Sequence, residues 1–150
     1  MSLKGRNAQV DCLAGTAPGS LPSSEAKAAL ETSLKEGREH DLVVQSVRVA
    51  LEAVCSEVRI PPEPKVRAVP GLFHLFTPAE GTLHAEATLG KTVRRLHPTP
   101  ATGGWPRTSA LGLIRFLEGR SRGWYGAAIG WIGADGAALA EARRHGRGTA

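Results

Sequence analysis

Five histidines and two cysteines are the side chains in this 150-residue sequence that could bind a transition metal. The histidines are His40, His74, His84, His97 and His145. No two of them have the HxxxH spacing that places two zinc ligands on one face of a helix, and Cys12 and Cys55 match no zinc-ligand spacing. These patterns disfavour a zinc site. His74, which lies in an apolar segment, is then either a buried structural histidine or a catalytic group.

Glu39 is a carboxylate whose position in a predicted helix is compatible with two roles. It lies four residues before Val43 and extends the apolar stripe of a predicted helix by one turn. One interpretation is a capping carboxylate that the helix dipole stabilises. The other is a ligand for Mg²⁺, a hard cation that prefers carboxylate oxygen and water. The spacing alone leaves both interpretations open.

Residues 97–106, with the sequence HPTPATGGWP, are predicted to form a shaped loop because they contain several prolines and glycines. Such a loop is either a structural connection or a surface that presents backbone groups to a ligand. The chain has no GxSxG pattern for a serine nucleophile, and its glycines match neither the P-loop nor the dinucleotide-binding pattern.

The elements that must position these residues follow from hydrophobic spacing and from helix-capping residues. The clearest is a helix from Glu39 to Val58, which ends before the prolines at 61, 62 and 64. An earlier helix is predicted from Ser23 or Ser24 to about Lys35, after a loop at 15–20. The other predicted elements are strands at 72–77 and 81–84, helices at 85–96 and 108–117, a glycine-containing strand at 122–132 and a weak helix from 135.

Length and composition restrict the class of protein. One domain is expected for 150 residues, and 41% hydrophobic with 22% charged residues is typical of a folded chain. The net charge is +5, but Lys and Arg are scattered without a nucleic-acid-binding motif, so no nucleic-acid partner is expected. No apolar run is long enough for a membrane span or a secretory signal, so no membrane association is expected. The two cysteines fit a reducing, cytoplasmic location.

Five segments, in order along the chain, together resemble the chorismate-utilising enzymes, and isochorismate synthases most closely. The most specific is LHPTPATGGWPR at 96–107, which resembles the family's LHPTPAVGGTPR. The other four are LAGTAP at 13–18 for LAGTxPR, KEGREH at 35–40 for KDRxEH, HLFT at 74–77 with Gly81 for HLxTxxxG, and RGWY at 122–125 with Gly130 and Trp131 for RGWYAGPVGW.

The resemblance implies an enzyme that isomerises chorismate to isochorismate with Mg²⁺, for menaquinone or catechol siderophore biosynthesis. In that family a general base activates water, a general acid assists the leaving hydroxyl, and Mg²⁺ holds a substrate carboxylate. By resemblance Glu39 would be a Mg²⁺ ligand, and His74 would be catalytic and face the ring hydroxyl region. Gly15 and Thr16 would hydrogen bond the substrate, while Ala101 and Tyr125 would line the pocket.

The resemblance also implies an α+β fold with antiparallel sheets flanked by helices, of which this chain holds a part. Residues 1–10 are then a non-matching N-terminus, 11–132 a partial chorismate-binding domain, and 133–150 a divergent tail rich in Ala, Gly and Arg. The family's general base and acid lie upstream of the segment matched by Gly15, and a second metal carboxylate lies downstream of the segment matched by Trp131. We therefore expect a chain truncated at both ends that does not turn over chorismate usefully.

Two other interpretations remain open. One is that the chain is a non-catalytic module that binds chorismate or assembles with another protein, or that it is a gene remnant without function. The other is a salicylate- or anthranilate-type relative, against which the HPTPA sequence at 97–101 argues. The sequence predicts neither the pathway nor the oligomeric state.

Overall fold

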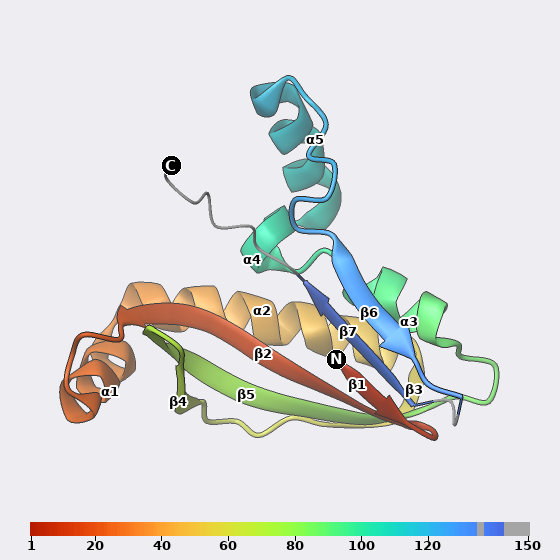
Figure 1. Ribbon diagram of the computed structural model, residues 1–150, viewed down its shortest axis with the longest axis horizontal. Helices are drawn as coiled ribbons and strands as arrows, with labels where there is room; N and C mark the ends of the chain where they lie inside the picture. The colour runs from red at the N-terminus through yellow and green to blue at the C-terminus, as the bar shows by residue number, and fades with distance from the viewer. Residues whose placement is uncertain (135–136, 143–150) are drawn as a thin grey trace.

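A seven-stranded antiparallel sheet with helices packed against it forms the body of the protein in a computed structural model (Figure 1). The structure describes residues 1–134 and 137–142. The sheet order is β3-β5-β2-β1-β7-β6, and β4 also pairs with β5. The strands are β1 (Ser2–Lys4), β2 (Asn7–Pro18), β3 (Cys55–Arg59), β4 (Lys65–Val69), β5 (Leu72–Leu83), β6 (Ala128–Ile132) and β7 (Ala138–Ala142). This architecture confirms the expected α+β fold with an antiparallel sheet.

Five helices accompany the sheet in the part of the chain that the structure describes. They are α1 (Ser23–Thr32), α2 (Leu34–Glu52), α3 (Leu89–Leu96), α4 (Pro100–Gly103) and α5 (Arg107–Glu118). The Ser33 hydroxyl caps α2 by accepting a hydrogen bond from the Glu36 N–H at 3.3 Å. None of these helices has the length and apolar character needed to cross a membrane.

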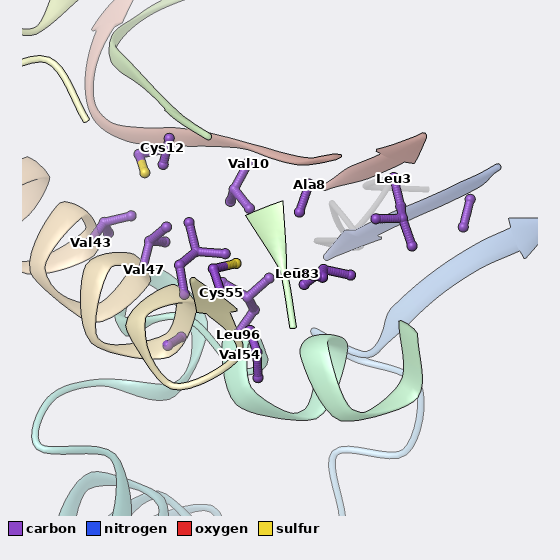
Figure 2. Packing of buried hydrophobic residues seen from close by; sticks show 14 residues of the cluster. Leu3, Ala8, Val10, Cys12, Val43, Val47, Val54, Cys55, Leu83 and Leu96 are labelled. Carbon is purple, nitrogen blue, oxygen red and sulfur yellow. The ribbon is translucent and has the colours of Figure 1, made fainter. Parts of the chain in front are cut away.

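The core lies between α2 and the two long strands β2 and β5. The apolar stripe of α2 is buried there, as its helical spacing predicts. Figure 2 shows Val43 and Val47 of α2 facing Val10 and Cys12 of β2. A smaller cluster packs Leu30 of α1 under the other end of the same strands. The helix that carries Glu39 is therefore fixed against the sheet that carries Gly15, Thr16 and His74.

The pairing of β2 with β5 is interrupted by a register shift between Ala14 and Thr16. Gly15 lies at this irregularity with a φ of +73°, a conformation that favours glycine. A Cβ at this position would lie 3.1 Å from both the Glu36 carbonyl oxygen and the Leu75 side chain. Glycine therefore allows the end of β2 to pass close to the first turn of α2.

Several elements differ from the sequence-based predictions. The loop predicted at 15–20 is mostly strand, since β2 continues to Pro18 by pairing with β5. The long helix ends at Glu52 rather than Val58, because residues 55–59 pair with β5 as β3. The two short strands predicted between 72 and 84 form one strand, β5. In each case long-range pairing decides the structure where local patterns are ambiguous.

The segments outside the recognised motifs also contribute to the sheet. Ser2–Lys4 pairs with β2 and with β7. Ala138–Ala142, in the tail expected to have weak helical potential, is strand β7 and pairs with β1 and β6. Residues 143–150 of that tail lie outside the described residues. The loop predicted at 97–106 holds one short helical turn, α4.

Candidate functional site

A cleft of about 950 Å³ runs beside β2, at the part of that strand that extends past the short β1. The cleft is bordered by α2, α3, β5 and the segment from His97 to Thr102. Five of the six residues singled out from the sequence line it: Gly15, Thr16, Glu39, His74 and Ala101. They come from four of the five motifs, so the fold gathers separate segments of the chain at one place.

Tyr125, the sixth candidate residue, is not among the residues that line the cleft. Its ring is about half exposed and lies 5.4 Å from the guanidinium of Arg122. The same Arg122 donates a hydrogen bond from Nη1 to the Thr102 carbonyl at 2.7 Å. Tyr125 therefore belongs to a segment that supports the cleft wall at 101–102.

His74 and the end of β2 form the polar centre of the cleft. His74 Nδ1 lies 3.1 Å from the Gly15 carbonyl oxygen and 3.0 Å from Thr16 Oγ1. Because a carbonyl oxygen can only accept, Nδ1 carries the proton of the neutral ring and donates to Gly15. In this tautomer the other ring nitrogen, Nε2, has a lone pair that can accept a hydrogen bond from a ligand.

Glu36 is a site residue that the sequence analysis did not single out. Its Oε2 accepts a hydrogen bond from the Thr16 N–H at 2.7 Å, which joins the first turn of α2 to the end of β2. This hydrogen bond, followed by that from Lys35, lowers the pKa of the Glu36 carboxyl below its usual value. Glu36 lies in the KEGREH segment, but its role in the site depends on a contact with a residue 20 positions away in the sequence.

Lys35 lies between two carboxylates at the rim of this site. Its Nζ is 3.1 Å from Glu36 Oε1 and 3.3 Å from Glu39 Oε1. The hydrogen bonds to Glu36 and then Glu39 raise the pKa of the lysine. A positive charge is therefore already held at the position where two carboxylates converge.

This pair of carboxylates fits a magnesium ion in the chemistry of its donors. Mg²⁺ usually keeps several waters and is held by one or two carboxylates, and Glu36 and Glu39 supply two, with an ammonium already between them. Among the described residues no group of three or more His, Cys, Asp and Glu side chains could hold a metal ion. Solvent and substrate would have to supply the remaining ligands.

His40, the last residue of the same motif, is a buried structural histidine. Its Nε2 is 2.8 Å from the Thr77 Oγ1, so it joins α2 to β5. Burial lowers the pKa of this imidazole. Cys12 is also buried, and burial raises the pKa of its thiol to about 12, so it is not a thiolate nucleophile.

The glycines of the 97–106 segment give the cleft wall its shape. A Cβ at Gly103 would lie 2.7 Å from the Pro98 side chain, and Gly104 has a φ of +70°. These glycines let α4 fold back on Pro98, which places Ala101 and Thr102 at the cleft. The segment is thus a shaped connection that also faces the candidate site.

Comparisons with known proteins match this chain to one family of enzymes. The family model described as chorismate binding enzyme matches residues 1–143. The salicylate biosynthesis isochorismate synthase of Pseudomonas aeruginosa is 39% identical over 137 residues, which are 89% of this chain and 29% of that protein. The isochorismate synthase MenF of Bacillus subtilis is 46% identical over 94 residues, which are 63% of this chain and 20% of that protein.

A solved structure has the same arrangement of elements. The crystal structure of DhbC from Bacillus anthracis, described as a 2,3-dihydroxybenzoate-specific isochorismate synthase, matches with a TM-score of 0.84 and 29% identity. The match covers 94% of this chain and 39% of that one. The chain thus spans well under half the length of the relatives it matches.

Proposed function

Because this chain belongs to the chorismate binding enzyme family, we propose that its cleft binds chorismate as part of an isochorismate synthase-type site. The single observation that carries the proposal is the convergence of Gly15, Thr16, Glu39, His74 and Ala101 on one cleft. Each of these residues lies in a segment whose sequence resembles an isochorismate synthase motif.

Four of these residues have roles that their contacts support. Gly15 and Thr16 present backbone groups and a hydroxyl at the end of β2, where an anionic ring substrate could hydrogen bond. His74 faces the same space with a ring nitrogen free to accept. When bound at Glu39 and Glu36, Mg²⁺ would supply positive charge for a substrate carboxylate.

We further propose that the chain binds chorismate without converting it to isochorismate. The resemblance assigns the general base and the general acid to segments outside those matched here, and the chain spans 29% of the Pseudomonas aeruginosa relative. Loss of one such group typically costs on the order of 10²–10⁴ in rate. This chain would then act as a binding fragment of a larger catalytic site.

The test is to titrate the purified chain with chorismate in the presence and absence of Mg²⁺. Calorimetry measures binding, and chromatography of the same mixtures measures isochorismate. We expect saturable, Mg²⁺-dependent binding and no isochorismate above the uncatalysed background.

His74→Ala should weaken that binding, because it removes a polar group of the cleft. His84→Ala is the matched control and should leave affinity unchanged, because His84 follows the last residue of β5 and lies outside the cleft lining. Turnover at rates typical of enzymes would contradict the proposed inactivity. Failure of the unmodified chain to bind chorismate would contradict the site itself.

A further inference from the structure

The ammonium of Lys35 occupies a position between two carboxylates that a small cation would also favour. Its Nζ contacts one oxygen of Glu36 and one of Glu39, at 3.1 and 3.3 Å. The two glutamates differ in how firmly they are held. Glu36 is 18% exposed and anchored by the Thr16 N–H, whereas Glu39 is 52% exposed and contacts Lys35.

Lys35 itself is poorly anchored. Its side chain is 76% exposed, and its ion pairs within the described part of the chain are with these two carboxylates. A lysine side chain has four rotatable methylene bonds and a strongly hydrated head, so it can move into solvent at small cost. The carboxylates, in contrast, come from the first turns of α2, which packs against the sheet.

We infer that Lys35 is a built-in competitor of the divalent cation for Glu36 and Glu39. In the absence of a cation the ammonium offsets part of the negative charge of the two carboxylates and bridges them. A bound Mg²⁺ takes the same oxygens and displaces Lys35 into solvent. This inference deepens the proposed function, on which it rests for the identity of the cation site.

Glu36 connects the cation position to the polar centre of the cleft. One oxygen of Glu36 contacts Lys35 and the other accepts from the Thr16 N–H. Exchange of the ammonium for a divalent ion therefore acts on the carboxylate that fixes Thr16. Occupancy of the cation position and the placement of the Thr16 amide are joined through a single side chain.

Removal of the lysine charge should strengthen cation binding by about tenfold at low ionic strength, because a nearby positive charge repels a divalent cation. The gain should shrink at high ionic strength, where the repulsion is screened. Lys27 provides a matched control, since it also pairs with a glutamate four residues later, Glu31, but on the exposed face of α1.

The experiment measures the dissociation constant of Mn²⁺, as an oxygen-seeking probe, from the electron paramagnetic resonance signal of the free ion. Mg²⁺ is then added to displace it. The unmodified chain, Lys35→Gln, Lys27→Gln and Glu39→Gln are compared at low and high salt, without any assay of turnover. Far-UV circular dichroism verifies that each variant keeps its fold, which is expected because all three side chains are largely exposed.

Support for the inference is tighter binding by Lys35→Gln, with Lys27→Gln unchanged and Glu39→Gln weakened. Binding by Lys35→Gln but not by the unmodified chain would support it more strongly. Equal affinity of Lys35→Gln and the unmodified chain would overturn the inference while leaving the cation site in place. Absence of Mn²⁺ binding by every protein would overturn both the inference and the Mg²⁺ part of the proposed function.

Discussion

Glu36 uses its two carboxylate oxygens for different parts of the site. Oε2 accepts from the Thr16 N–H, and Oε1 accepts from Lys35. The Thr16 hydrogen bond is the main reason that the pKa of Glu36 lies below its ordinary value. An ionised carboxylate therefore holds the Gly15–Thr16 segment against α2 at neutral pH.

His40 should make the free energy of unfolding depend on pH. Burial lowers its pKa below the ordinary value of 6.5. As the pH falls below that value the unfolded chain takes up a proton that the folded chain does not yet bind. The free energy of unfolding should therefore fall between about pH 7 and 5, by about 1.4 kcal/mol for each unit of pKa difference. Urea denaturation at a series of pH values measures this slope.

His40→Gln should flatten that slope, because glutamine does not titrate but can still hydrogen bond to Thr77. Some slope should remain, since burial and Arg107 also lower the pKa of His97. His84→Gln serves as the control for removal of a histidine elsewhere. An unchanged slope in His40→Gln would show that this imidazole does not account for the acid sensitivity.

Five of the six residues named from the sequence line one cleft, but the contacts between them cannot be read from the motifs. Glu39 and His74 were found from motifs, and both line the cleft. Glu36 was missed because its partner, the Thr16 N–H, is brought close only by the fold. Tyr125 was placed in the pocket by resemblance, whereas its ring contacts Arg122 outside the cleft lining.

At the scale of elements, α2 is the most predictable part of the fold and β2 the least. The stripe from Val43 to Leu51 has helical spacing and is buried as expected. β2 begins in residues that carry little local signal and continues through Gly15 into Pro18, so that local patterns indicate a loop. Its strand conformation comes from pairing with β5 over most of its length. The sequence of one segment does not show with which distant strand it will pair.

The packing of α2 on the sheet should dominate the stability of the described part of the chain. Leu51 is fully buried in the main core cluster, whereas Val49, two residues earlier on the same helix, is 59% exposed. Leu51→Ala should lower the free energy of unfolding by about 2–5 kcal/mol. Val49→Ala should change it by no more than about 0.5 kcal/mol. Urea denaturation of both variants tests this, and equal costs would show that α2 does not pack as described.

At the scale of the whole molecule, large apolar side chains are exposed on α5 and on residues 124–132. The group comprises Leu113, Phe116, Leu117, Trp124, Ile129, Trp131 and Ile132. α5 buries none of its residues and projects away from the sheet (Figure 1). β6 ends the sheet, paired only with β7 among the described residues. Exposed apolar surface and an unpaired strand edge both favour association.

The edge at β6 should therefore make the purified chain associate with itself as its concentration rises. Trp131, 56% exposed on β6, is the largest side chain of that strand. Trp131→Lys should reduce association, because a charged side chain on an edge strand opposes further pairing. Val49→Lys places the same charge at a similarly exposed apolar position on α2 and should have little effect. Sedimentation velocity over a range of concentrations distinguishes the two variants. An equal reduction by both would indicate that added charge, rather than the β6 edge, controls association.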